Sequence, residues 1–497
     1  MKPLKFLLKT VAVMLLLVIA IIVVRAFDAR RMPDLKMWHR ACLESEFRAE
    51  HNVPGFTYKD YRAMENALFK ELDREVYERV DPVEDLLFSR YHPESPSNPR
   101  RFSRDWNRSF ELTPPLVKGG ALLIHGLTDS PYSLKKAGEV LHDQGFYVLG
   151  MRMPGHGTTP GELTEVNWPD WMAAVMVGAR HVLDRIDAGQ PFFMLGYSTG
   201  GALAVKYALD GLENPEQAAP DRLILFSPAI GVTPFALFAD WHKVLSFIPY
   251  FEKFKWTAVE PEYDPFKYTS FPKNGGEQIH RLTRSLKEQI ARMHEQGRLS
   301  ECPPITTFQS LVDTTVLTDA IVHDLYDKLN SPRSELVLFD INRAAPIRPF
   351  LKSTHEDLLT ELNGRGQLPY RLTLITNSEE DPFNVVEKSR PAEGQEIVAR
   401  PLGLRWPSQV YSLSHLAIPF SPEDGVYGDG RGQSETGRFS LGSLAPRGER
   451  NLLRISMREF MRLRYNPFFE YVRNRLAAIA ASAKANGEAS GSPPEGG

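Results

Sequence analysis

The sequence predicts an α/β fold in which a mostly parallel sheet is covered by helices on both faces. Short apolar runs alternate with helix-forming stretches between residues 119 and 227, and these runs are apolar almost throughout. Strands of a parallel sheet have this composition because helices bury both of their faces. A third observation is a Gly-Tyr-Ser-Thr-Gly turn between an apolar run and a helix, which gives the fold a candidate reactive group.

The expected elements follow one another in short units. We expect strands at residues 121–124, 146–149, 192–195 and 223–226, and helices at 134–144, 170–185 and 202–209. The alternation stops between residues 229 and about 304, where aromatic residues are frequent. These are Phe235, Phe238, Trp241, Phe247, Tyr250, Phe251, Phe254, Trp256, Tyr263, Phe266, Tyr268 and Phe271. An aromatic-rich insertion at this place indicates a cap over an apolar pocket.

Ser198 is the candidate nucleophile. It is the central residue of Gly196-Tyr197-Ser198-Thr199-Gly200, between the apolar run 192–195 and the helical run 202–209. A strand, a tight turn and a helix around G-x-S-x-G hold a serine on strained backbone with its hydroxyl exposed. Glycines are needed because the turn brings backbone too close for a β-carbon. A tight turn with a bystander serine is the alternative, and the flanking elements disfavour it.

The partners that a nucleophilic serine needs follow downstream. A base must take the hydroxyl proton and an acid must orient that base, and hydrolases with this turn have the chain order Ser, Asp or Glu, His. The β-branched and apolar run 305–312 ends at Asp313, and His415 follows the strand-like run 410–413. Open α/β sheets carry their functional groups at the carboxyl ends of strands. We therefore expect Asp313 to orient His415.

Two other acids compete with Asp313 for this role. Asp340 follows the apolar run 336–339, and Asp381 lies further on. Asp313 is preferred because the strand that it ends comes next after the cap.

The oxyanion hole is expected on the loop after the strand at 121–124, together with the turn at the nucleophile. That loop begins His125-Gly126-Leu127, and the glycine lets the backbone turn an amide inward. We assign the two donors to the backbone N–H groups of Leu127 and Thr199. His125 and His156 are expected to bond loop backbone near the site.

These residues carry a resemblance to a known family. The segments concerned are His125-Gly126-Leu127-Thr128, Met153-Pro154-Gly155-His156-Gly157, Trp168-Pro169-Asp170-Trp171, Gly196-Tyr197-Ser198-Thr199-Gly200-Gly201, Asp313 and Ser414-His415. On them the chain resembles α/β-hydrolases of the monoacylglycerol lipase and bacterial carboxylesterase group, relatives of the serine aminopeptidases. The likeness covers residues 119–227 and resumes around Asp313 and His415, which is less than half of the chain.

The resemblance implies a serine esterase or lipase with an α/β-hydrolase fold, a helical cap, and no metal or organic cofactor. It implies Ser198 as nucleophile, His415 as base, Asp313 as orienting acid, and Leu127 and Thr199 as amide donors. The chain departs from the family in two places. About seventy residues separate Phe339 from His415, including a strand candidate at 371–376, and a long stretch precedes Gly119.

The chain is expected to divide into five parts. Residues 1–27 form an N-terminal membrane anchor, and residues 28–117 form an accessory region with an amphipathic helix at 58–80 and an irregular linker at 92–115. Residues 118–450 form the hydrolase domain, with the cap at about 229–304 and an insertion at about 341–409. Helices at 451–485 and a disordered tail at 486–497 complete it.

The N-terminal segment predicts an uncleaved transmembrane helix. Lys2, Lys5 and Lys9 precede an almost unbroken apolar run at residues 11–24, and no Ala-x-Ala cleavage site follows. We expect a single-pass protein of the inner membrane with its catalytic domain on the extracytoplasmic side. Basic residues after the run leave the opposite orientation open.

Composition excludes some classes of partner. The 497 residues carry a formal net charge of −3 and no basic block interleaved with aromatic residues, so nucleic acid is not an expected partner. Cys42 and Cys302 make no metal pattern and no disulfide framework. The oligomeric state is not fixed by these observations.

The sequence therefore predicts a membrane-anchored serine hydrolase that acts on a small-molecule or lipid-like carboxylic ester. A serine aminopeptidase would use the same residues with acidic groups in the cap, for which Glu260, Glu262 and Asp264 are candidates. An acyltransferase would use the same residues as well. A non-catalytic membrane scaffold that kept the fold is the alternative from another class. A dehalogenase is disfavoured because its nucleophile would be a carboxylate at position 198.

Overall fold

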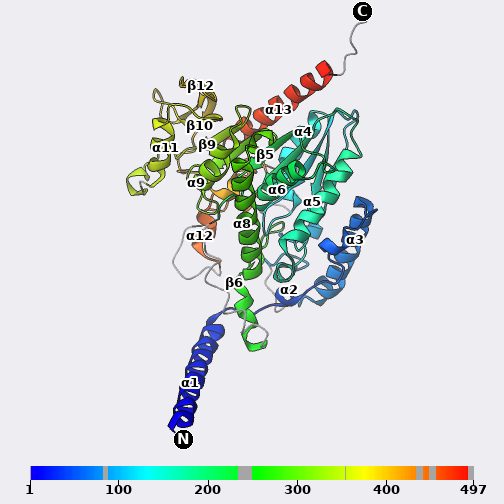
Figure 1. The fold of residues 1–497 in the computed structure, drawn as a ribbon, viewed down its shortest axis with the longest axis vertical. Coiled ribbons are helices and arrows are strands. Elements are labelled where there is room, and N and C mark those ends of the chain that lie inside the picture. The colour runs from blue at the N-terminus through cyan, green and yellow to red at the C-terminus, as the bar shows by residue number, and fades with distance from the viewer. Residues whose placement is uncertain are drawn as a thin grey trace, which may run out of the picture.

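The structure is a computed structural model that describes residues 2–81, 88–232, 249–352, 354–432, 440–446 and 455–490. Its centre is a ten-stranded, mostly parallel sheet with helices on both faces, so the predicted α/β fold is confirmed (Figure 1). In spatial order the strands are β1 (Phe110–Leu112), β3 (Phe146–Met151), β2 (Gly119–Ile124), β4 (Phe192–Tyr197), β5 (Arg222–Phe226), β8 (Ile305–Ser310), β9 (Glu335–Phe339), β10 (Arg371–Asn377), β11 (Asn384–Arg390) and β12 (Val398–Arg405).

The strands from β3 to β10 are parallel, whereas the outer strands are antiparallel. β1 pairs antiparallel with β3 at one edge, and β10, β11 and β12 form an antiparallel meander at the other. In the parallel part, Leu122 lies beside Met194, and Leu195 lies beside Ile224. The carboxyl ends of β2, β4 and β8 therefore meet at one edge of the sheet, where the predicted site residues follow.

Helices lie on both faces because the parallel strands are apolar on both. The helices of the described part are α1 (Lys2–Arg31), α2 (Met37–Arg40), α3 (Tyr58–Glu75), α4 (Lys135–Asp143), α5 (Trp168–Leu183), α6 (Thr199–Glu213), α8 (Lys273–Glu295), α9 (Thr318–Ala320), α10 (Asp327–Leu329), α11 (Thr354–Gly364), α12 (Met457–Met461) and α13 (Phe469–Ser490). One buried cluster joins α5, α6 and α8 to one face of the sheet, and a second joins α4 and α13 to the other. Successive residues of β2 contribute to opposite clusters, as alternation along a strand requires.

The cap follows β5, as expected. It contains a 3₁₀ segment (Pro249–Lys255), the two-stranded sheet of β6 (Trp256–Ala258) and β7 (Phe271–Pro272), and the long helix α8, which packs on α6. The expected cap aromatics Phe235, Phe238, Trp241 and Phe247 lie outside the described residues.

The insertion between Phe339 and His415 extends the sheet. The predicted strand at 371–376 is present as β10, which pairs parallel with β9. The insertion also supplies α11 and the antiparallel strands β11 and β12, which the sequence analysis did not foresee. The strand-like run at 410–413 is not a strand: the side chain of Asn342 donates to Val410 O at 3.0 Å, and its backbone N–H donates to Tyr411 O at 2.8 Å.

The accessory region packs on the hydrolase domain through α3. The predicted helix at 58–80 ends earlier than expected, at Glu75, and a 3₁₀ turn (Tyr77–Arg79) follows. Tyr58 and Tyr61 join the core cluster that contains α5. The expected irregular linker at 92–115 contains the short strand β1, so this part of the prediction was wrong.

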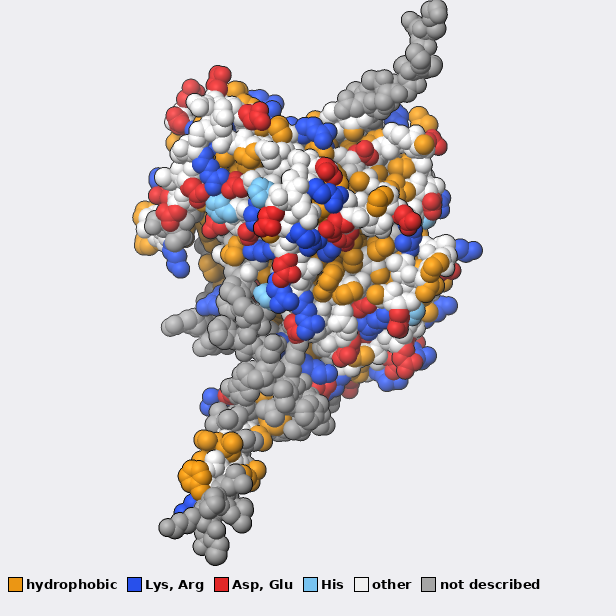
Figure 2. Space-filling model, in the orientation of Figure 1, with side chains coloured by type: hydrophobic (Ala, Val, Ile, Leu, Met, Phe, Trp, Pro, Cys, Tyr) orange, Lys and Arg blue, Asp and Glu red, His pale blue; other side chains and the backbone are white. Residues whose placement is uncertain are grey.

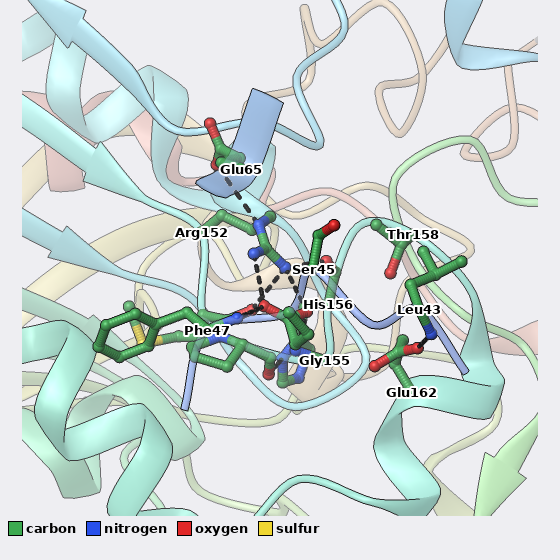
Figure 3. A network of polar contacts seen from close by, with 12 residues as sticks. Leu43, Ser45, Phe47, Glu65, Arg152, Gly155, His156, Thr158 and Glu162 are labelled. Atoms are coloured by element: carbon green, nitrogen blue, oxygen red, sulfur yellow. Dashed lines mark hydrogen bonds and ion pairs between the residues drawn. The ribbon is translucent and has the colours of Figure 1, made fainter. Parts of the chain in front are cut away.

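A cluster of buried charges fastens the accessory region to the loop after β3 (Figure 3). Arg152 donates to both carboxylate oxygens of Glu46, at 2.7 and 2.9 Å, and its Nε lies 3.4 Å from Glu65 Oε1. Gly155 N donates to Glu46 at 2.8 Å, and Ser109 Oγ donates to Glu65 at 2.8 Å. The pairing offsets the cost of burying these charges.

The N-terminal segment forms the helix α1, which extends away from the sheet (Figure 1). Among the residues that the structure describes, no helix combines the length and the apolar character needed to cross a membrane, so the predicted transmembrane helix is not supported. Apolar side chains of α1, such as Phe6 with 74% of its surface exposed, lie in the open (Figure 2). The last turns of α1 pack on Phe251 and Phe254 of the cap.

The C-terminal part consists of two helices, as predicted. The short helix α12 and the longer α13 correspond to the expected helical pieces, but α13 continues to Ser490 rather than ending near residue 484. Residues 486–490 of the expected disordered tail are therefore helical, and residues 491–497 lie outside the described part. Cys42 is exposed and Cys302 is buried, and both are free thiols.

Candidate active site

Ser198 lies at a sharp turn between β4 and α6. Its backbone has φ 53° and ψ −114°, a conformation that residues other than glycine rarely adopt. Two contacts with the segment at the end of β5 hold the turn: Ser198 N donates to Phe226 O, and Ala229 N donates to Ser198 O, each at 2.9 Å. Such strain persists only where the surrounding structure over-determines it, and it is typical of functional sites. The turn has the geometry that the sequence predicted.

The glycines of this turn are required by close packing. A β-carbon on Gly200 would lie 1.9 Å from Ile124 O, and one on Gly196 would lie 2.4 Å from Gly200 O. Both contacts are with backbone, which cannot move aside as a flexible side chain can. Because both residues lack a β-carbon, the end of β2 packs closely against the first turn of α6. The loop after β2 therefore lies beside Ser198.

Asp313 and His415 are in contact although they are distant in sequence. His415 Nδ1 lies 2.8 Å from Asp313 Oδ2, and both side chains are buried. The second carboxylate oxygen of Asp313 accepts from Thr315 N at 2.8 Å and Val316 N at 3.1 Å. Burial favours the neutral acid, yet the His415 ring and these N–H donors together hold the pKa of Asp313 below its ordinary value. A carboxylate there fixes the tautomer in which Nδ1 carries the proton.

The two competing acids have other partners. Asp340 pairs with Arg343 at 2.7 Å and accepts from Thr376 Oγ1 at 2.6 Å. Asp381 accepts from Phe383 N and lies 3.6 Å from Arg405. The structure therefore brings Asp313, and neither of the other two, to the histidine.

His415 begins a 3₁₀ turn (His415–Ala417) and is held through its backbone and its neighbours. Tyr197, the residue before the serine, donates its hydroxyl to His415 O at 3.3 Å. The two rings lie 5.3 Å apart between centroids. Ser310 Oγ, at the end of β8, donates to Leu413 O at 2.8 Å. The loop that carries the histidine is thus fastened to the carboxyl ends of β4 and β8.

The backbone N–H groups of Leu127 and Thr199 are the expected donors of the oxyanion hole. Within the described residues neither group has a hydrogen-bond acceptor, and both residues line the same cavity as Ser198. Thr199 is the first residue of α6, whose N-terminus carries partial positive charge. Two free donors beside a serine hydroxyl form the arrangement that stabilises an oxyanion.

A cavity of about 450 Å³ contains Ser198 and His415. Within the described residues no hydrogen bond joins the Ser198 hydroxyl to the His415 ring, and such bonds often tighten only when substrate binds. Among the aromatic residues expected in the cap, those that line the cavity are Tyr263, Tyr268 and Phe271. The cavity also contains charged side chains, among them Asp129, Glu260, Lys267 and Arg462.

Asp129 and Lys267 are features of the site that the sequence analysis missed. Lys267 Nζ of the cap lies 3.2 Å from Asp129 Oδ2, and the next residue, Tyr268, donates its N–H to Thr128 O at 2.8 Å. The cap thus holds the loop that carries Leu127. Burial raises the pKa of Asp129 to about 6, although Lys267 opposes the shift. The signal in the sequence was weak, because an acid after a strand gives no hint of a lysine in the cap.

His125 and His156 bond loop backbone, as expected. Met153 N donates to His125 Nε2 at 2.9 Å, so the proton of this neutral ring is on Nδ1, which lies 2.8 Å from Gly126 O. His156 Nδ1 lies 2.9 Å from Pro154 O. Burial lowers the pKa of His125 and, to about 4, that of His156. In the part of the chain that is described, no group of three or more His, Cys, Asp or Glu side chains is placed to hold a metal ion.

A family model and a curated relative each match a part of the chain. Residues 117–340 match the family described as serine aminopeptidase, S33. A thermostable monoacylglycerol lipase of Bacillus sp. (strain H-257) is 34% identical over 89 residues, which are 18% of this chain and 34% of that protein. The chain therefore aligns with about a third of the length of that relative.

Solved structures of lipolytic enzymes are similar to about half of the chain. A structure of the metagenome-derived lipolytic enzymes LipS and LipT gives a TM-score of 0.37 at 21% identity and covers 52% of this chain and 98% of its own. A monoacylglycerol lipase of Paleococcus ferrophilus gives 0.35 at 18% identity and covers 51% and 97%.

Proposed function

We propose that this chain, which is similar over residues 117–340 to the serine aminopeptidase family and over 89 residues to a monoacylglycerol lipase, is a serine hydrolase that cleaves carboxylic esters. One observation carries the proposal. A strained serine, a histidine in contact with a buried carboxylate, and two unpaired backbone N–H groups all belong to residues at one cavity or directly behind it. The curated relative that matches, a monoacylglycerol lipase, favours an ester over an amide.

In the proposed reaction, His415 Nε2 takes the proton of Ser198 while the serine oxygen attacks the ester carbonyl carbon. Asp313 holds the proton on Nδ1 and stabilises the positive charge that the ring gains. The N–H groups of Leu127 and Thr199 stabilise the negative oxygen of the tetrahedral intermediate. The alcohol leaves with a proton from His415. Water then cleaves the acyl-enzyme through the same groups.

The lining of the cavity supports an ester with an apolar acyl part. Phe271 and Ile279 come from the cap and its long helix, and Val232 comes from the segment after β5. Two carboxylates of the cavity pair with cations of the same lining: Asp264 lies 3.5 Å from Arg464, and Asp129 lies 3.2 Å from Lys267. A lipid-like ester such as a monoacylglycerol is therefore our proposed substrate class.

Replacement of Ser198 tests the proposal. Ser198→Ala should lower the kcat for p-nitrophenyl butyrate by at least about 10⁴-fold, because no other group can form the acyl-enzyme. Ser300→Ala, at an exposed position of a 3₁₀ turn, is the matched control and should leave kcat unchanged. Ester turnover that survives in folded Ser198→Ala protein would contradict the assignment.

A serine aminopeptidase is the second candidate, favoured by one observation. Glu260 lines the cavity, and no hydrogen bond or ion pair to its carboxylate occurs within the described residues, so it is free to hold a substrate amine. Glu262 is bonded to Thr269 and Ser270, and Asp264 to Tyr427 and Arg464, which leaves neither free. Hydrolysis of amino-acid arylamides in preference to butyrate esters would favour the peptidase, and loss of that preference in Glu260→Gln would identify the group responsible.

Localisation is a separate proposal that rests on the sequence. The lysines before the apolar run at residues 11–24, together with the exposed apolar side chains of α1, favour attachment to the inner membrane with the catalytic domain outside. Carbonate-washed membranes should retain the full chain and release a variant that lacks residues 1–27. Release of the full chain by the same wash would contradict attachment through this segment.

A further inference from the structure

A second cluster of charged residues lies at the amino ends of the strands, the edge of the sheet opposite Ser198. Arg222, Glu335 and Arg371 begin β5, β9 and β10, and Arg333 precedes β9. Arg475 reaches the same place from α13. These side chains line a cavity of about 340 Å³. The five residues of β5 separate this cavity from the catalytic edge by about 16 Å, from a rise of about 3.3 Å per residue.

We call this cavity the arginine pocket. It is lined by more positively charged side chains than negatively charged ones. Glu335 is its only acid within the described residues, and the two oxygens of this side chain accept from Thr373 Oγ1 and from Arg475. Arg222 bonds the hydroxyl of Thr306 at 3.2 Å, and Arg371 bonds the hydroxyl of Ser389 at 3.1 Å.

Three arginines therefore lack a counter-charge. In the described part of the chain, no carboxylate lies within ion-pair distance of Arg222, Arg333 or Arg371. The Nε atom of Arg475 is also buried without a hydrogen-bond partner. Burial lowers the pKa of Arg222, and the charges of Arg333 and Arg475 lower it further, whereas the charge of Glu335 opposes the shift. Converging like charges raise the energy of the unliganded protein, and a bound anion would offset this cost.

A larger cavity on the insertion between Phe339 and His415 contains cationic side chains that are paired with carboxylates. It has a volume of about 780 Å³ and also contains several cationic side chains. There Arg343 pairs with Asp340 at 2.7 Å, and Lys388 pairs with Glu379 at 2.7 Å. Arg390 in that cavity donates to the carbonyl groups of Leu362 and Arg365, whereas in the arginine pocket the one ion pair within the described residues is that of Arg475 with Glu335.

We propose that the arginine pocket binds a polyvalent anion of the phosphate type. Guanidinium groups match the oxygens of a phosphate with paired N–H donors, and the hydroxyl of Thr306, which accepts from Arg222, can add a further donor at the same cavity. A bound anion joins α13, through Arg475, to the amino ends of β5 and β10. The pocket admits inorganic phosphate, pyrophosphate or the head group of an anionic lipid, and these share the recognised chemistry.

Isothermal titration of the full chain with pyrophosphate at constant ionic strength tests this proposal. We expect saturable binding of one pyrophosphate per chain. Arg333→Gln and Arg371→Gln, at exposed positions, should each weaken the binding by about tenfold. Arg284→Gln, on α8 with 72% of its side chain exposed, is the control and should bind as the unaltered protein does. Arg475→Gln is unsuitable because it would leave Glu335 buried without its partner.

A second arm of the experiment distinguishes the source of the anion. Vesicles of phosphatidylglycerol, compared with vesicles of phosphatidylcholine, report an anionic lipid, whereas binding of pyrophosphate alone reports a soluble ligand. Either result supports the site if Arg333→Gln and Arg371→Gln weaken it. Absence of saturable binding to both probes, or equal weakening by Arg284→Gln, would overturn the proposal. None of these readouts depends on the hydrolase activity.

Discussion

Two regions of the molecule bury charged side chains. One is the Arg152 cluster, formed by Arg152, Glu46 and Glu65, and the other is the catalytic cavity, which Ser198 and His415 line. They differ in which hydrogen-bonding groups have no protein partner. Around Arg152, both oxygens of Glu46 accept from the guanidinium, and backbone N–H groups of Phe47 and Gly155 complete the contacts. At the cavity lined by Ser198, Asp264 and, directly behind it, Asp313 have such contacts on both carboxylate oxygens. The Ser198 hydroxyl and the N–H groups of Leu127 and Thr199 have no protein partner within the described residues.

The difference separates a structural use of buried charge from a chemical one. A cluster whose charged groups pair with one another stabilises one arrangement of the chain. An unsaturated group beside a cavity costs stability, and it persists where a substrate supplies the missing partner. The comparison predicts that changes in the catalytic cavity alter the rate, whereas changes around Arg152 alter the stability.

Among the variants that keep Ser198, the largest effect is expected at Asp313. Asp313→Asn removes the charge that holds the proton on His415 Nδ1, and we expect kcat for ester hydrolysis to fall by about 10³- to 10⁴-fold. Asp340→Asn is the matched control, because Asp340 is equally buried but pairs with Arg343. The control should keep kcat within about twofold for the folded protein. If both variants lost activity alike, Asp313 would have no special part in catalysis.

The next effect is expected at Glu46. Glu46→Gln leaves the buried Arg152 with a weaker counter-charge, and we expect the free energy of unfolding to fall by about 3–5 kcal/mol. Urea denaturation measures this loss, and kcat for the folded fraction should stay near that of the unaltered protein. Glu44→Gln, at an exposed position two residues earlier, should change stability by less than about 0.5 kcal/mol. A large loss of kcat with unchanged stability would contradict the structural role.

Asp129 should produce a smaller effect that depends on pH. Its pKa in the folded protein is raised to about 6, whereas an unfolded aspartate titrates near about 3.9. The folded state therefore binds an extra proton between these values, so the contribution of Asp129 to stability is present below about pH 4 and is lost as pH rises through 6. Asp129→Asn should flatten this part of the stability profile. The exposed control Asp143→Asn should leave the profile unchanged.

The smallest effect is expected at Tyr197. Tyr197→Phe removes the hydrogen bond to His415 O, which is worth about 0.5–1.5 kcal/mol. Because this bond positions the histidine loop, kcat should fall a few-fold. Tyr207→Phe removes a comparable bond to Ala218 O on the far side of α6 and should lower stability alone. Equal kcat in both variants would show that the tyrosine beside the serine does not position the base.

Much of the catalytic edge could be predicted because its signals are local. The glycines around Ser198 mark a turn in which a β-carbon would collide with backbone, and Asp313 lies three residues after the end of the buried strand β8. Each of these features needs only a few neighbouring residues. The contact between Asp313 and His415 was predicted from the Ser–Asp–His chain order of hydrolases with this turn, although the run before His415 is not a strand.

Other features could not be predicted because they depend on distant segments. β1, β11 and β12 carry exposed and polar residues at the edges of the sheet, so they lack the apolar run that marks a buried strand. The run at 410–413 has the composition of a strand, yet two of its carbonyl groups accept hydrogen bonds from Asn342. The arginine pocket forms only because strands separated by long connections begin at the same edge.

The account rests on Ser198 as the group that becomes acylated, and a covalent probe tests this most directly. The full chain should react with a fluorophosphonate to gain one adduct, and peptide mapping by mass spectrometry should locate it on Ser198. Ser198→Ala should gain none under the same conditions. An adduct on another residue, or a folded and unmodified protein after prolonged exposure, would contradict the account.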